Sequence, residues 1–278
     1  MSDVSPLRSN RATGSIARWG RRPETGLSAL LFVIVTAGWE IIVRLLDVSS
    51  LVISPPSAIA LALWGNLGSA RFYYHAGITL WEILAGFVIG SLVGLVIGIA
   101  IGQWKILEKT VYPYVVALQT VPKVAIAPMI IIWFGYGLAS KIVITALIVF
   151  FPVVVNCIAG MEAASTQQIE MLMSFTASRW QIFRMVKLQT ALPYIFAGLD
   201  VAIVLAVIGA IVGEFIGSQA GLGNLLLQKN FSMDTAGSFA ILIVLSVMGI
   251  VLHKLMTALK RRVVFWMEPE ATIATEAT

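Results

Sequence analysis

Six long apolar runs divide this chain and decide what it can fold into. They cover residues 26–46, 83–102, 111–134, 141–161, 194–216 and 237–259. A helix needs about 20 apolar residues to cross the hydrocarbon core of a bilayer, and each run reaches that length. The runs also lack the apolar/polar alternation of membrane-spanning strands. We therefore expect an all-α, polytopic membrane protein with about six transmembrane helices.

The charged residues outside these runs are few and unevenly placed. Only 12% of the 278 residues are charged, about half the share of a soluble domain. If the amino terminus is cytoplasmic, the outer segments hold four basic residues, Arg44, Arg71, Lys141 and Lys229. The cytoplasmic segments then hold Arg8, Arg11, Arg18, Arg21, Arg22, Lys105, Lys109, Arg179, Arg184, Lys187, Lys254, Lys260, Arg261 and Arg262. Because short cytoplasmic loops are enriched in Lys and Arg, both termini are predicted to be cytoplasmic.

The runs and their connections predict four regions. Residues 1–25 form a basic cytoplasmic tail, and residues 26–72 form the first transmembrane helix with an outer interfacial segment. Residues 73–262 form the transmembrane core with a cytoplasmic loop at 162–190, and residues 263–278 form a second tail. The single cysteine, Cys157, lies within a span and offers no paired metal-ligand spacing, so we expect no metal site.

Glycines recur at every fourth position along the second run. They are Gly86, Gly90, Gly94, Gly98 and Gly102. In a helix this spacing places all five on nearly one face, where a neighbouring backbone can approach closely. The stripe therefore predicts a close helix contact, either within one subunit or at a subunit interface. The third run contains Pro113, Pro122 and Pro128 and the fourth contains Pro152, which predicts bent helices that either line a pathway or pack as kinked segments.

A basic, amphipathic segment interrupts the apolar pattern at residues 171–193. Ser178 and Gln181 have the spacing of a capping box, so a short helix is predicted from Arg179 to about Leu188, after an earlier short helix at 166–175. Pro193 is expected to open the fifth span, because a first-turn proline costs no hydrogen bond there. From the chemistry alone, the segment could simply adhere to the membrane surface.

The segment also resembles a known motif, the EAA loop of permease subunits of bacterial binding-protein-dependent ATP-binding-cassette importers. That pattern is Glu-Ala-Ala, three residues, Gly, nine residues, then Ile-x-Leu-Pro. The literal Glu162-Ala163-Ala164 does not fit, whereas the register with the acid at Glu170 does. In this register Thr176 replaces the glycine, Gln189 replaces the proline, and Met171 and Leu172 replace the alanines. If the glycine position requires a positive φ, the β-branched threonine there is strained.

The resemblance covers about residues 50–266. It is similar to the nitrate, sulfonate, taurine and bicarbonate branch of these permeases, and near Val121-Pro122-Lys123 and Gly213-Glu214-Phe215 it is similar to permeases for thiamine-precursor pyrimidines or riboflavin. The matching phrases are PYVVALQTVPKVAIAPMIIIWFGYGLASKI, FFPVVVNCIAG, ALPYIFAGLDVAIVLAVIGAIVGEF and SQAGLGNLLL.

This resemblance implies an importer of the bacterial cytoplasmic (inner) membrane. Two permease subunits pair, a cytoplasmic ATPase dimer grips each EAA loop, and an extracytoplasmic binding protein delivers the solute. The implied coupling surface consists of Glu170, Thr176, Ala177, Ser178, Arg179, Trp180, Phe183 and Arg184. The chain has no G-x-x-x-x-G-K-[ST] motif, so ATP and Mg are expected on the partner ATPase and no cofactor on this chain. A secondary transporter or channel is the alternative.

Three polar residues are candidates for the translocation pathway. Lys123 lies near mid-bilayer, where an ionisable group either lines a pathway or makes a structural contact. Asn156 could hydrogen-bond between helices or face the pathway. Glu214 lies near the outer face, as a gate, a binding-protein contact or a solvated or paired acid. Glu82 and three other polar residues near the span ends are expected to reach the interface or pair locally. The sequence contains no candidate pair of nucleophile and base, so we expect a transport subunit rather than an enzyme.

Overall fold

The computed structural model describes residues 23–266, whose regular elements are all helices. The two predicted tails lie almost entirely outside this range. The chain divides into two units, residues 1–48 and residues 49–278. In the first unit, α1 spans Pro23–Leu45 and is apolar enough to cross a membrane.

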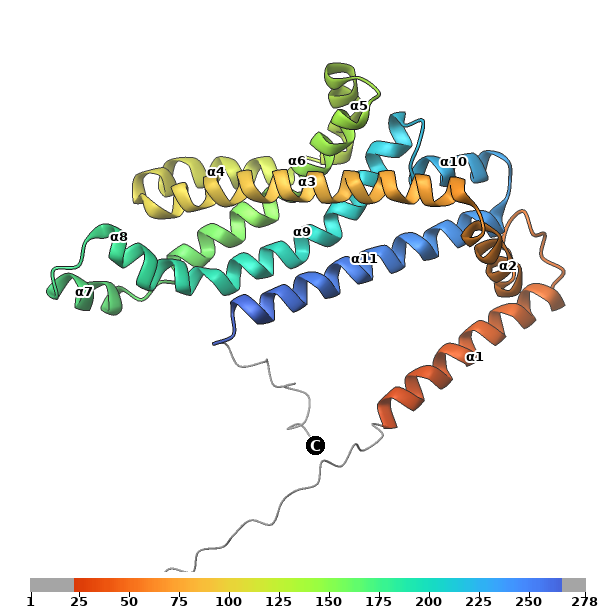
Figure 1. Ribbon diagram of the computed structural model, residues 1–278, viewed down its shortest axis with the longest axis horizontal. Helices are drawn as coiled ribbons and strands as arrows, with labels where there is room; N and C mark the ends of the chain where they lie inside the picture. The colour runs from red at the N-terminus through yellow and green to blue at the C-terminus, as the bar shows by residue number, and fades with distance from the viewer. Residues whose placement is uncertain (1–22, 267–278) are drawn as a thin grey trace, which may run out of the picture. The chain divides into compact units, whose positions relative to one another are not determined.

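The second unit holds the remaining helices (Figure 1). They are α2 (Pro56–Leu67), α3 (Ala70–Gln103), α4 (Lys105–Thr120), α5 (Lys123–Phe134), α6 (Leu138–Glu162), α7 (Thr166–Ser174), α8 (Arg179–Ile182), a π-helical turn (Phe183–Lys187), α9 (Leu188–Gly217), α10 (Leu222–Phe231) and α11 (Thr235–Val263). Across the described residues, five helices are long and apolar enough to span a membrane, and the bent pair α4–α5 makes a sixth. The predicted all-α fold with about six spans is confirmed.

Helix α6 is the central element of the second unit and packs along both α3 and α9. Its side chains at Val149, Val153, Cys157 and Ile158 are fully buried. A helix that is apolar all round is expected to be enclosed by other helices, and α6 has that character. Its burial leaves α3 and α9 to present their outer faces to lipid.

The glycine stripe of α3 faces α6 in the same chain. A Cβ added to Gly90 would lie 2.4 Å from the carbonyl oxygen of Ala146, and one added to Gly98 would lie 2.7 Å from Cβ of Cys157. A Cβ added at any of the other three glycines of the stripe would also meet an atom of α6 at 3.0 Å or less. The close helix contact predicted from the spacing is therefore present within one subunit.

The third apolar run is two helices rather than one. Helices α4 and α5 meet at an angle of 92°. Val121 is extended because the following Pro122 disfavours helical geometry at the preceding residue. The carbonyls at the end of α4 lack intrahelical donors, so the Lys123 ammonium donates to the Gln119 oxygen (2.5 Å) and the Thr120 hydroxyl donates to the Ala117 oxygen (2.7 Å). Two side chains at the bend thus supply hydrogen-bond donors to carbonyl groups at the end of α4.

Helix α9 connects the two ends of the second unit. In Figure 1, α7 and α8 lie at one end and α10 lies at the other. The helical segment is unbroken from Arg179 through the π-helical turn to Gly217. The sequence prediction of a separate short helix followed by a span opening at Pro193 is therefore wrong. Pro193 lies inside α9, where buried neighbours such as Ala191 and Ile195 hold the helix together despite the missing hydrogen bond.

Candidate functional site

The α7–α8 hairpin, residues 166–182, is the first candidate site. Its second helix begins with the predicted capping box: the Gln181 side chain accepts from the Ser178 amide (2.7 Å) and Ser178 Oγ accepts from the Gln181 amide (3.3 Å). The helix at 166–174 is also present as predicted. These local hydrogen bonds fix where α8 starts, independently of the membrane-spanning core.

The turn of the hairpin is a Schellman motif centred on Thr176. The Ala177 amide donates to the Leu172 carbonyl and the Thr176 amide donates to the Met173 carbonyl. This arrangement requires a left-handed residue, and Thr176 has φ of 59°. Glycine is the usual residue there because a Cβ is disfavoured in this region, most of all on a β-branched side chain. The strain predicted for threonine at this position is therefore present.

Replacing Thr176 with glycine is expected to stabilise the protein. The change removes the cost of a left-handed conformation, about 1–2 kcal/mol. It also costs about 0.5–1 kcal/mol, because glycine loses more conformational entropy on folding. The net gain in the free energy of unfolding should be about 0.5–1 kcal/mol, measured by chemical unfolding in detergent. Thr190→Gly, inside α9, is the matched control and should lower stability. A loss of stability in Thr176→Gly would show that the backbone at Thr176 is not strained.

Large apolar side chains cover the hairpin without burying one another. Met171, Met173, Phe175 and Trp180 are exposed, and Trp180 retains 68% of its accessible surface. The Trp180 ring stacks on Phe183 with centroids 5.3 Å apart. Beside them, Met171, Met185 and Gln189 line part of an open groove of about 560 Å³. An exposed apolar surface of this kind, flanked by Arg179 and Arg184, is typical of a protein-protein contact.

The hairpin is joined firmly to the membrane core. Val186, in the π-helical turn, is buried, and the Lys187 ammonium donates to the Gln103 side chain at the end of α3 (3.3 Å). Single π-helical turns are often found at functional positions. Movement of the hairpin would therefore be transmitted to both α9 and α3.

The three predicted pathway residues are not brought together. Lys123 lies at the α4–α5 bend with its ammonium 4.8 Å from the Phe151 ring. Asn156 lies at the α6–α9 contact, where its amide donates to the Pro152 carbonyl (2.8 Å). Glu214 lies near the end of α9 and is fully buried. Within residues 23–266, no hydrogen bond or ion pair joins any two of the three.

Sequence reasoning missed a buried polar cluster around Glu214. It consists of His75, Thr79, Glu82, Lys141 and Glu214, all buried. From the sequence, Glu82 was expected just before the second span and Lys141 in an outer segment. Helix α3 begins at Ala70 instead, so Glu82 is well inside it, and Lys141 is only 2% exposed. The apolar pattern that already begins at Phe72 could have indicated that this helix starts before Glu82.

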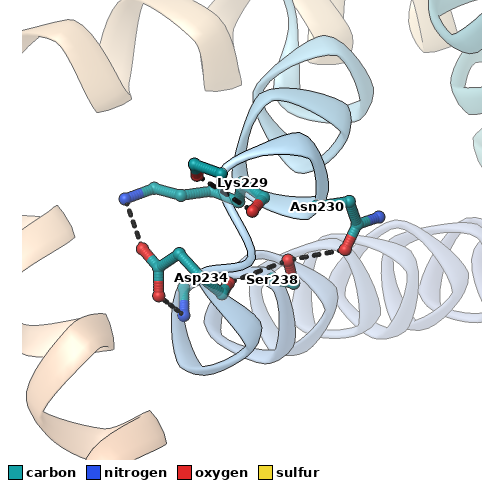
Figure 2. A network of polar contacts seen from close by, with 6 residues as sticks. Lys229, Asn230, Asp234 and Ser238 are labelled. Carbon is teal, nitrogen blue, oxygen red and sulfur yellow. Dashed lines mark hydrogen bonds and ion pairs between the residues drawn. The ribbon is translucent and has the colours of Figure 1, made fainter. Parts of the chain in front are cut away.

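A second set of polar contacts fixes the connection between α10 and α11. Figure 2 shows Lys229 paired with Asp234 (2.7 Å), Asp234 accepting from the Gly237 amide (2.8 Å), and Ser238 donating to Asn230 (2.8 Å). The hydrogen bond from Lys229 lowers the pKa of Asp234, so this carboxylate stays ionised as the cap of α11.

Comparisons with known proteins agree with these features. Residues 90–265 match the family described as "Binding-protein-dependent transport system inner membrane component". The chain is 34% identical to the formylaminopyrimidine transport permease protein ThiX of Halalkalibacterium halodurans, over 80% of this chain and 88% of that protein. It is 34% identical to the riboflavin transport system permease protein RibX of Chloroflexus aurantiacus, over 88% and 91%.

A sulfonate permease and one solved structure are also similar to this chain. The chain is 31% identical to the putative aliphatic sulfonates transport permease protein SsuC of Bacillus subtilis, over 85% of this chain and 86% of that protein. One chain of the inward-facing MetNI methionine ABC transporter superposes with a TM-score of 0.59 at 20% identity, covering 72% of this chain and 100% of that chain. The coverage, the multiple membrane-spanning helices and the exposed amphipathic hairpin together show that this chain belongs to the inner-membrane components of binding-protein-dependent transport systems.

Proposed function

We propose that this chain forms the translocation pathway of an ATP-driven importer and works as a pair of identical subunits. The observation that carries the proposal is the unbroken helix from Arg179 to Gly217. At 1.5 Å per residue it is roughly 58 Å long. A force applied to the α7–α8 hairpin would reach the opposite end of α9 without crossing a flexible loop, which supports alternating access driven from the cytoplasm.

The exposed surface of the hairpin is the proposed contact for a cytoplasmic ATPase. Trp180 and the flanking arginines provide the aromatic and basic groups that dominate many interfaces. ATP and Mg would bind to that partner, because this chain has no phosphate-binding loop. Among residues 23–266 no group of three potential metal ligands is found. The uneven distribution of Lys and Arg supports an orientation with both termini in the cytoplasm.

The opposite end of the second unit would then face outward, where an extracytoplasmic binding protein delivers the solute. The 34% identity to the formylaminopyrimidine and riboflavin permeases favours a heteroaromatic solute of that kind. An organic sulfonate is the second candidate, supported by the relative that is 31% identical and by the positive charge of Lys123.

The test is uptake by proteoliposomes that contain this chain, the cognate ATPase and the binding protein. We expect accumulation only with ATP, and competition by unlabelled formylaminopyrimidine or riboflavin rather than by taurine. Accumulation at full rate by this chain alone, with an ion gradient and no nucleotide, would show a secondary transporter instead. Competition by sulfonates alone would assign the second candidate solute.

Lys123 is proposed to face the solute during transport. A unit charge at roughly 10 Å is worth about 1.7 kcal/mol at an effective dielectric constant of about 20. Lys123→Met should therefore shift the preference between an anionic and a neutral solute by about 15-fold in the same uptake assay. Lys123→Arg keeps the charge and should keep the preference. An unchanged preference in Lys123→Met would remove this residue from the pathway.

A further inference from the structure

Four helices converge on the buried polar cluster at the end of the second unit that contains α10. Helix α3 contributes His75, Thr79 and Glu82, α6 contributes Lys141, and α9 contributes Glu214, which faces the start of α10. Glu82 and Glu214 are both 0% exposed. Two fully buried carboxyl groups in one cluster need an explanation, since buried charges are costly unless they are paired.

Glu214 has the partners of an ionised carboxylate. It accepts hydrogen bonds from the Thr79 hydroxyl (2.6 Å), from the Asn224 amide (3.3 Å) and from the Gly223 amide. The Leu222 amide in turn donates to Thr79 Oγ1 (2.7 Å). Glu214 therefore caps the amino terminus of α10, where a negative charge is stabilised by the free backbone amides.

Glu82 has none of these partners. Both of its carboxylate oxygens are buried and lack a hydrogen-bond donor. Glu82 lies one turn after Thr79 in α3, so its carboxyl is on the face of α3 where the Thr79 hydroxyl bonds Glu214. An ionised Glu82 would thus place a second negative charge beside the first, with no donor to stabilise it. A proton on Glu82 removes the charge and supplies the missing donor.

The charges around the pair are balanced only when it carries one proton. The Lys141 ammonium donates to the carbonyl oxygens of Tyr136 (2.5 Å) and Gly137 (2.9 Å), and its positive charge offsets one carboxylate. His75 faces the same turn, with Nδ1 3.0 Å from the Gly221 amide nitrogen and 3.1 Å from its oxygen. Arg71 lies one turn before His75 in α3, and its guanidinium donates a hydrogen bond to the Gln228 side chain (3.4 Å). The basic residue of α10, Lys229, is engaged by Asp234.

We propose that Glu82 and Glu214 form a proton-binding site in which one proton is shared between the two carboxyl groups. The shared proton connects α3 to the turn between α9 and α10. Its loss leaves two negative charges against one lysine and weakens that connection. Two buried carboxyl groups that share a proton behave as a coupled pair, so the proton belongs to the pair rather than to either residue.

The first test compares two conservative variants. Glu82→Gln replaces the protonated acid with an amide that still donates to Glu214, so it should fold and retain near wild-type stability in detergent. Glu214→Gln leaves one acceptor oxygen where two now accept, one from Thr79 and one from the Gly223 and Asn224 amides, and removes the negative charge at the start of α10, so it should be clearly less stable. If Glu82 were instead an ionised partner of Lys141, Glu82→Gln would be the more damaging change, and that result would overturn the proposal.

The second test detects the proton directly. Infrared spectra of the reconstituted protein at neutral pH should show the carbonyl stretch of a protonated carboxylic acid, shifted in heavy water. The band should be lost in Glu82→Gln and kept in Glu162→Gln, which changes an exposed acid. Absence of the band from the unaltered protein, or its persistence in Glu82→Gln, would overturn the assignment.

The third test uses the pH dependence of unfolding. The unfolded chain releases this proton above about pH 4.3, the ordinary value for glutamate, whereas the folded pair retains it. Stability should therefore fall as pH rises, with the unfolding equilibrium constant increasing by up to tenfold per pH unit for one proton. Glu82→Gln should remove that component of the slope. An identical slope in the variant would overturn the proposal.

Discussion

Gly90→Ala is expected to destabilise the protein by about 3 kcal/mol. The new Cβ would lie 2.4 Å from the Ala146 carbonyl oxygen and 2.9 Å from the Ala146 Cα. Both atoms belong to the backbone of α6, so no side chain can rotate to make room. Helices α3 and α6 would have to separate, and overpacking of this kind costs 1–3 kcal/mol or more. Chemical unfolding in detergent measures the loss.

Gly77→Ala provides the matched control on the same helix. No heavy atom lies within 4 Å of the Cβ that this change would add. Because alanine favours a helix over glycine by about 0.8–1 kcal/mol, Gly77→Ala should be neutral or stabilising. Equal stability of the two variants would show that α3 and α6 do not rely on close backbone contact at Gly90.

Trp180→Ala is expected to reduce ATP-driven uptake by roughly 30-fold. If the α7–α8 hairpin contacts the ATPase as proposed, this exposed indole is its largest aromatic group, and truncating such a residue commonly costs about 2 kcal/mol. Stability should change little, because the indole contributes little to the core. Uptake by proteoliposomes and co-purification of the ATPase with the variant measure the effect.

Trp64→Ala is the control for the loss of an exposed tryptophan. Trp64 lies on α2 and is 79% exposed, against 68% for Trp180. It is distant in sequence from the hairpin, and its removal should leave ATPase binding and uptake near the unaltered level. Full ATPase association and normal uptake in Trp180→Ala would argue against the hairpin as the coupling surface.

The hairpin shows how much local sequence can predict. The capping box at Ser178 and Gln181, the short helix at 166–174, the helix start at Arg179 and the strained turn at Thr176 were all expected from residues a few positions apart, and all are present. The roles assigned to Glu170 and Arg184 remain predictions, because they depend on a partner chain. The path of the chain after the hairpin was predicted wrongly, since Pro193 is a local signal that the packing of α9 overrides.

The sequence by itself determined the membrane-spanning helices, the capped hairpin and the close contact along the glycine stripe. Each of these follows from hydrophobic length or from spacing within a single helix. Only the tertiary structure decided the burial of Glu82 and Lys141. The physical reason is that these features depend on partners far away in the chain: Thr79 and Glu214, which meet at 2.6 Å in the buried polar cluster, are separated by 135 residues.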